Sequence, residues 1–144
     1  MESLGTDVHS GLGGSILPNA AWRLIWALNS LKGVDERILI PGFYDDVIPP
    51  SARDRELMEK LPDVADEYKQ RYGAKGFIKA LTGGTDLKVE EVFTPTCTIC
   101  GLTSGYQGVG QKTVQPASAS AKVDFRLVPN QKPDDILKKL RVHL

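Results

Sequence analysis

The stretch Ser118-Ala119-Ser120-Ala121-Lys122-Val123-Asp124-Phe125-Arg126-Leu127 alternates between polar and apolar side chains without interruption. Successive side chains of a β-strand point to opposite faces, so a period of two predicts a strand with one buried face. Antiparallel sheets often leave one face to solvent, whereas parallel sheets are covered on both. The stretch therefore predicts an antiparallel sheet with helices on one face only.

Other strands and helices are predicted on both sides of this stretch. The run Thr96 to Thr103 predicts a second strand, and Leu4 to His9 predicts the end of another. Asn19 is a good N-cap for a helix that ends before Gly33, and Pro133 favours the start of a final helix that runs to the chain end. Apolar residues recur at helical spacing in the first helix and are expected to face the core: Ala21, Leu24, Ile25, Leu28 and Leu31.

Residues 41–92 interrupt this pattern. They open on a loop rich in turn-forming residues, from Pro41 to Pro50. Two short charged helices follow, over Ser51 to Lys60 and Asp63 to Tyr72, and Ser51 and Asp63 are their predicted N-caps. Apolar positions are sparse in both helices, so we expect a helical insertion on the surface of a single domain that spans residues 1–144.

The order of elements is strand, helix, insertion, strand, strand, helix. This is the order of an α+β, ferredoxin-like (split βαβ) fold whose last strand is missing, and we expect that strand to lie beyond Leu144. A three-stranded sheet with an unprotected edge predicts either a longer domain or pairing of that edge with another chain.

Composition excludes several partners. Lysine plus arginine and aspartate plus glutamate both number 18, so no net charge favours nucleic acid or an anionic membrane. No apolar run approaches the roughly 20 residues of a membrane-spanning helix. The first five residues, Met1 to Gly5, lack the basic and apolar regions of a signal peptide. We therefore expect a soluble, cytoplasmic protein.

Cys97 and Cys100 form a C-x-x-C motif, which could be a redox pair or half of a zinc site. A redox pair needs a helix N-terminus to lower the thiol pKa, and this motif lies in a predicted strand. Side chains three residues apart in a strand point to opposite faces, so we expect two reduced thiols rather than a disulfide.

Two glycine-rich segments resemble nucleotide-binding loops and fail their templates. In the segment from Gly105 to Thr113 the lysine is one position too far from the second glycine, and Pro116 and a strand follow where a helix is needed. In the segment from Gly11 to Gly14, Ile16 stands where the dinucleotide fingerprint needs glycine. Both segments are therefore interpreted as tight loops.

The residues available for hydrolytic chemistry are few. A metal site needs several His, Asp or Glu ligands that converge on the ion, and the chain has only His9 and His143, neither with a ligand partner at a suitable spacing. Ser10 follows His9 directly and is not placed as a nucleophile in a Ser/His/Asp set. We predict no metal site within this chain.

Short motifs along almost the whole chain, taken in order, resemble the lid and dimerisation domain of zinc metallopeptidases. The family includes aminoacylase, carboxypeptidase G, acetylornithine deacetylase and carnosine dipeptidase, and the resemblance is to its dipeptidase-like branch. The motifs are Asp7-Val8-His9-Ser10-Gly11 with Gly13-Gly14, Pro41-Gly42-Phe43-Tyr44-Asp45, Pro95-Thr96, Gly105-Tyr106-Gln107-Gly108, Lys112-Thr113-Val114-Gln115-Pro116-Ala117, and Phe125-Arg126-Leu127-Val128-Pro129.

The resemblance implies a parent enzyme in which a separate catalytic domain holds two zinc ions and this chain forms a homodimer. It implies that His9 reaches into the active site of the other subunit, where it polarises the scissile carbonyl of a small peptide or N-acyl amino acid. It implies that Thr113 and Arg126 hold the substrate carboxylate. Gln115 departs from the family, which more commonly has a hydrophobic residue there.

Pattern alone gives simpler interpretations of the same residues. Without the motifs, Arg126 is an exposed strand residue and His9 is a loop histidine. A second function therefore stays open at this point, an independent ferredoxin-like binding or regulatory module that shares only the fold. If the chain is the lid of a larger enzyme, we expect it to be inactive alone.

Overall fold

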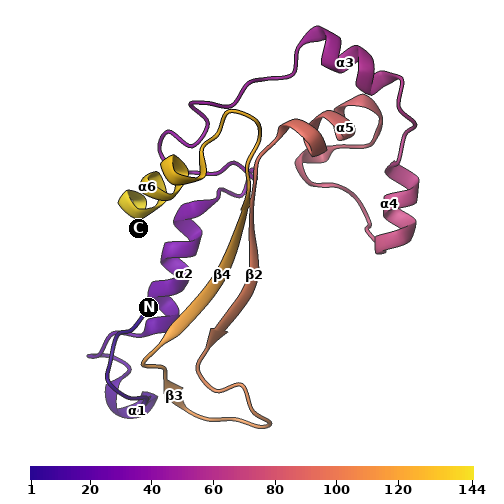
Figure 1. Ribbon diagram of the computed structural model, residues 1–144. Coiled ribbons are helices and arrows are strands. Elements are labelled where there is room, and N and C mark those ends of the chain that lie inside the picture. Colours follow the sequence, from indigo (N-terminus) through magenta and orange to yellow (C-terminus); the bar gives the residue numbers. More distant parts are fainter.

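The computed structural model describes all residues from Met1 to Leu144. Its central element is a long antiparallel pair of strands, β2 (Thr96–Ser104) and β4 (Ala119–Arg126), shown in Figure 1. Two helices, α2 (Ala20–Leu31) and α6 (Pro133–His143), lie on the same face of this pair. The α+β class, the antiparallel pairing and the placement of helices on one face are thereby confirmed.

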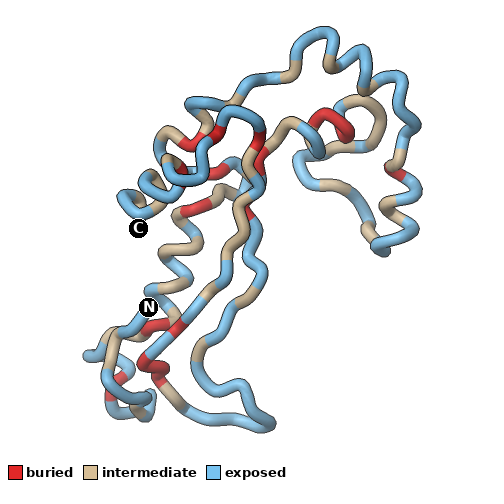
Figure 2. Tube along the Cα trace, viewed as in Figure 1, coloured by how far each residue is buried: buried red, intermediate tan, exposed pale blue.

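The main core lies between the upper half of the strand pair and these helices. Figure 2 shows its buried segments gathered where α2, α6 and the start of β2 meet. Val123 and Phe125 of β4 pack against this core, while Lys122 before them and Arg126 after them are exposed. The alternation in the sequence therefore marks the two faces of β4 correctly. The buried members of the core are Leu31, Ile38, Ile40, Phe43, Cys97 and Ile136.

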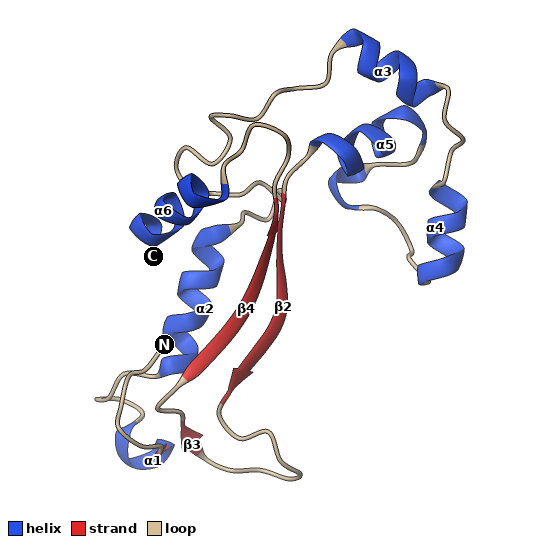
Figure 3. Ribbon diagram, viewed as in Figure 1, coloured by secondary structure: helices blue, strands red, loops and turns tan.

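The N-terminal strand differs from the prediction, because it does not extend the β2–β4 sheet. Instead β1 (Val8–His9) pairs antiparallel with β3 (Val114–Gln115) in a separate two-stranded sheet. Pro116 lies between β3 and β4, and proline lacks the N–H that a continuous strand would donate. The break leaves the β1–β3 sheet as a small unit below the main strands, next to the one-turn helix α1 (Ser10–Gly13) (Figure 3).

Helix α2 begins as predicted, because the Asn19 side chain accepts a hydrogen bond of 3.2 Å from the Trp22 amide. Its outer face carries Trp22 and Trp26, whose rings stack with centroids 6.2 Å apart. Ile25 was expected in the core and is instead 44% exposed, since it lies toward the tryptophan side of the helix. The apolar surface of α2 is therefore wider than the face that packs on the sheet.

The segment between the core residue Phe43 and β2 carries three α-helices and extends away from the strand pair (Figure 1). Helix α3 (Ala52–Glu59) has the predicted cap, a reciprocal pair between Ser51 and Asp54. Helix α4 (Ala65–Tyr72) begins one residue later than predicted, with Val64 as its N-cap.

Asp63 has a different role from the predicted cap. Its carboxylate accepts hydrogen bonds from the amides of Ala65 and Gly84, at 3.0 and 2.8 Å, and so joins the start of α4 to the start of α5 (Gly84–Phe93). The sequence did not predict α5 or the short 3-10 helix η1 (Ile78–Ala80). Helix α5 has no side-chain cap, and Gly83 and Gly84 at its start both have positive φ.

The two cysteines are unpaired, and they lie as the strand assignment requires. Cys97 is buried in the core and Cys100 is exposed. Burial raises the pKa of the Cys97 thiol, because desolvation disfavours the thiolate. Cys97 is therefore a structural thiol of the core.

Candidate functional site

His9 and Thr113 lie together at the end of the molecule formed by the β1–β3 sheet. The ladder places His9 opposite Val114, and the Ser10 amide donates a hydrogen bond of 3.0 Å to the Thr113 carbonyl. These backbone contacts bring the two side chains together, with His9 Nε2 3.0 Å from Thr113 Oγ1. Both residues are exposed to solvent. The structure therefore brings two of the three predicted site residues together.

The tautomer of His9 follows from its other contact. The Gly11 amide donates a hydrogen bond of 3.0 Å to His9 Nδ1, so Nδ1 is an acceptor and carries no proton. In the neutral imidazole the proton is then on Nε2, which donates to Thr113 Oγ1. Gly11 permits this approach, because a Cβ at that position would lie 3.0 Å from His9 Cε1. In this arrangement the N–H of His9 and the hydroxyl of Thr113 are hydrogen-bonded to each other at the surface.

Two further residues hold this end of the molecule in place. Gln115, which is only 2% exposed, donates from its amide nitrogen to the carbonyls of Leu17 and Pro18, at 2.7 and 3.2 Å. The Asp7 carboxylate accepts a hydrogen bond of 2.9 Å from the Ala117 amide. Sequence reasoning noticed Gln115 only as a departure from the family and gave Asp7 no role of its own. Both residues join β1 or the segment before α2 to the chain around β3.

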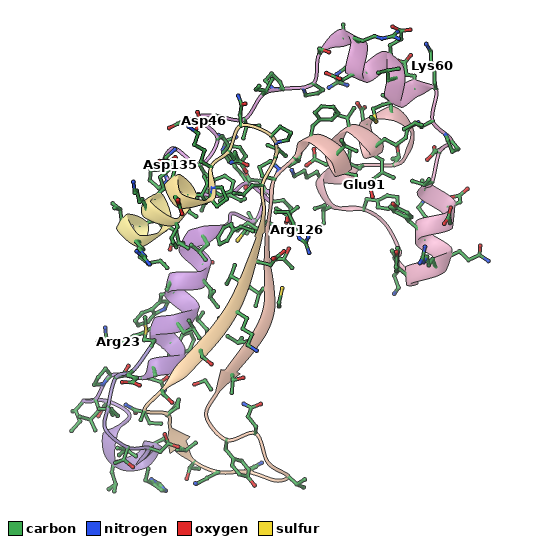
Figure 4. The ribbon with its side chains drawn as sticks, in the orientation of Figure 1. Arg23, Asp46, Lys60, Glu91, Arg126 and Asp135 are labelled. Atoms are coloured by element: carbon green, nitrogen blue, oxygen red, sulfur yellow. The ribbon has the colours of Figure 1, made fainter.

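Arg126 lies elsewhere, at the opposite end of β4. Ala119 and Arg126 bound that strand, and seven steps of about 3.3 Å separate them by roughly 23 Å. Arg126 is paired with Thr96 across the ladder, and Figure 4 shows it beside the helical segment that carries Glu91. Within one chain, Arg126 is therefore not next to Thr113, although the resemblance implies that both hold a carboxylate.

The Arg126 side chain is free to bind a further group. Its Nε donates a hydrogen bond of 2.9 Å to the Asp124 carboxylate, and its two terminal nitrogens have no protein partner. The side chain is 81% exposed. A guanidinium that keeps its terminal nitrogens in solvent can take a carboxylate through two parallel hydrogen bonds.

The chain's own residues do not fit a metal ion. No group of three or more His, Cys, Asp or Glu side chains lies together. His9 contacts Thr113, whereas His143 contacts the Ser30 carbonyl at 2.9 Å on the end of α2. A metal site needs three or four converging donors, so no step of a reaction can be assigned to a metal held by these residues.

A second feature of the surface is a set of exposed apolar side chains on two neighbouring elements. Helix α2 carries Trp22, Ile25 and Trp26, and strand β2 carries Ile99 and Leu102. β2 pairs only with β4, so its outer edge has unpaired backbone groups. An apolar surface beside an open strand edge is typical of a contact with another protein chain.

None of the helices is long and apolar enough to cross a membrane.

The comparisons with known proteins agree with one another. The model of the peptidase dimerisation domain family matches residues 1–144. A β-Ala-His dipeptidase from Rattus norvegicus is 30% identical over 143 residues, which cover 96% of this chain and 28% of that protein. A Cys-Gly metallodipeptidase from Candida albicans is 29% identical over 140 residues, which cover 95% of this chain and 28% of that protein. The chain therefore spans little more than a quarter of the length of these relatives.

Solved structures show the same likeness. An M20 family metallo-carboxypeptidase from Sulfolobus solfataricus matches with a TM-score of 0.89 at 34% identity, over 99% of this chain and 37% of that structure. Human carnosine dipeptidase 1 matches with a TM-score of 0.89 at 26% identity, over 99% of this chain and 30% of that structure. The helical segment between residues 41 and 92 is thus included in the match.

Proposed function

The chain belongs to the peptidase dimerisation domain family, and we propose that it is the lid of a longer metallopeptidase. In this proposal a separate catalytic domain holds two zinc ions and supplies the metal chemistry. The relatives are named as metallodipeptidases or dipeptidases, which supports metal use in the parent protein. The residues of this chain would bind substrate, orient it and hold two subunits together.

The unpaired Cys97 and Cys100 fit a reducing compartment, so we propose a cytoplasmic location.

The proposed partner in the dimer is a second copy of this chain. The stacked Trp22 and Trp26 on α2 and the open edge of β2 give each copy an apolar face and unpaired backbone donors and acceptors. A two-fold axis would bring the same surface of both copies together. The contact would then bury the exposed tryptophans and give the unpaired backbone groups of β2 hydrogen-bond partners. Burial of the tryptophans would supply much of the association energy.

Sedimentation of the chain and two variants tests this interface. Trp26→Glu would place a charge in the proposed contact and should convert the dimer to a monomer. Val142→Glu is the matched control, because Val142 is also exposed and apolar but belongs to α6 rather than to the tryptophan face of α2. A wild-type monomer, or a Trp26→Glu variant that dimerises as tightly as the control, would contradict the proposal.

The contact between His9 Nε2 and Thr113 Oγ1 is the observation that carries the proposed catalytic role. The Gly11 amide fixes the proton on Nε2, and this N–H would exchange its hydrogen bond to Thr113 for one to the oxygen of the scissile carbonyl, where charge develops in the reaction. The Thr113 hydroxyl can hold the substrate beside it. Because Arg126 lies at the far end of β4, a strand roughly 23 Å long, a substrate that meets Thr113 and Arg126 together must receive them from different subunits.

We therefore propose that each active site of the dimer contains residues from both lids. His9 and Thr113 would come from one subunit, and Arg126 would come from the subunit whose catalytic domain holds the substrate. The substrate class is a peptide or N-acyl amino acid with a free carboxylate, because a guanidinium with two free nitrogens suits that group.

Replacement of His9 in the full-length enzyme tests the catalytic role. His9→Ala should lower kcat about a hundredfold to a thousandfold, the usual scale for one lost oxyanion donor. Dimerisation and the free energy of unfolding should change little, since His9 is exposed. A Ser10→Ala variant is the neighbouring control. A His9→Ala enzyme within twofold of wild type would show that His9 has no part in the reaction.

A further inference from the structure

A pocket lies beside β2, between the start of that strand and the helical segment. Its volume is about 330 Å³, at the lower end of the range for small-molecule sites. Its walls come from the turn after α2, from η1 and α5, and from the first residues of β2. The apolar part of the lining includes Ile38, Phe77, Ile78, Leu81 and Leu87.

The charged groups around the pocket already have partners within the chain. Lys32 pairs with Glu36, and Lys79 pairs with Glu90. The Glu91 carboxylate accepts a hydrogen bond of 2.7 Å from the Tyr68 hydroxyl. Because both lysines and all three carboxylates already have partners, and most of the remaining lining is apolar, the pocket favours an apolar group over a charged one.

Arg126 lies next to this pocket. It is the ladder partner of Thr96, and Thr96 is part of the pocket wall. Residues directly opposite in an antiparallel pair share a face, so both side chains are on the same side of the sheet. Figure 4 shows Arg126 on the side of the strands that faces the helical segment with Glu91. A carboxylate on Arg126 would thus lie on the side of the strand pair where Thr96 borders the apolar pocket.

We propose that this pocket binds the side chain of the substrate residue that carries the free carboxylate, and that it selects large apolar side chains there. The inference rests on the proposed role of Arg126 in carboxylate binding. Arg126 would hold the carboxylate common to all substrates, and the pocket would distinguish among them. The helical segment would then act as the specificity element of the lid.

Two small probes test the proposal on the chain itself. N-acetylglycine and N-acetylphenylalanine both carry the carboxylate, but only the second has a side chain for the pocket. Titration followed by amide NMR shifts should give a dissociation constant at least about tenfold lower for N-acetylphenylalanine, the scale of burying one large apolar side chain. The shifts should include Thr96 and Leu87, which line the pocket.

Three variants test whether the pocket causes the preference for N-acetylphenylalanine over N-acetylglycine. Ile78 is 56% exposed and lines the pocket, so Ile78→Trp should fill it without unfolding the chain and should remove the preference. Phe77→Ala, which removes one apolar wall, should weaken the preference. Val92 is 51% exposed on α5 and does not line the pocket, so Val92→Trp should keep the full preference.

The outcomes separate this inference from the proposed function. Arg126→Ala should weaken both probes by the same factor and leave their ratio unchanged. Equal affinities for the two probes, with Arg126 still required, would overturn the pocket proposal and leave the carboxylate role intact. A preference that survives Ile78→Trp would also overturn it. If Arg126→Ala changes neither affinity, or neither probe binds, the carboxylate role of Arg126 is refuted and the inference fails with it.

Discussion

Replacement of the buried amide of Gln115 should destabilise the chain by a predictable amount. Gln115→Leu keeps a side chain of similar length and removes two hydrogen bonds, to the carbonyls of Leu17 and Pro18. Each such bond contributes about 1 kcal/mol net, and a partly buried carbonyl left without a partner adds a cost at the lower end of about 1 to 3 kcal/mol. The leucine regains part of this through apolar burial, so we expect a loss of about 2 to 3 kcal/mol in the free energy of unfolding.

Urea unfolding measures the effect directly. With a slope of about 2 kcal/mol per molar urea, the midpoint should fall by about 1 M. Gln111→Leu is the matched control, because Gln111 is exposed and has no hydrogen-bond partner in the chain, and it should change stability by less than about 0.5 kcal/mol. A Gln115→Leu midpoint within about 0.2 M of wild type would refute the argument that this amide joins β3 to the start of α2.

Three further results are expected. After dialysis the isolated chain should hold no stoichiometric zinc and should not hydrolyse dipeptides, and one tightly held zinc per chain with turnover would contradict this. A thiol reagent should modify Cys100 in the native chain and Cys97 only after unfolding, whereas a mass two protons too low would reveal a disulfide. Hydrogen bonds from the Ala65 and Gly84 amides lower the pKa of Asp63 below 3.8, so its stabilising effect is present above that pH and lost as pH falls through the lowered pKa. Asp63→Asn should accordingly lower the thermal midpoint at pH 7, and the difference from wild type should close in acid; a difference that is independent of pH would contradict the assignment.

Elements with a strong local pattern could be predicted from the sequence. The alternation of residues 118–127 gave the faces of β4, and Asn19 and Pro133 marked the starts of α2 and α6. Elements without such a pattern were missed. Helix α5 begins at Gly84, after the N-cap Gly83, and glycine is a poor helix former. Its first amide donates a hydrogen bond to Asp63, which lies in a distant part of the chain.

The candidate site was predictable only in part, because it depends on contacts between residues far apart in the sequence. The motifs identified His9 and Thr113, and the β1–β3 ladder brings them together across more than a hundred residues. The motifs did not show that Arg126, close to Thr113 in sequence, lies at the far end of β4. The Gln115 and Asp7 contacts likewise join segments about a hundred residues apart, so no local pattern reports them.

Mixing two inactive variants of the full-length enzyme is the most direct test of the central claim, that His9 serves the active site of the other subunit. One variant carries His9→Ala, and the other carries a broken metal ligand in the catalytic domain. In a heterodimer, one site then combines both defects and the other site has neither. Activity should therefore return on mixing, toward half that of wild type for each heterodimer. If subunit exchange is confirmed and no activity returns, His9 acts within its own subunit or has no catalytic role.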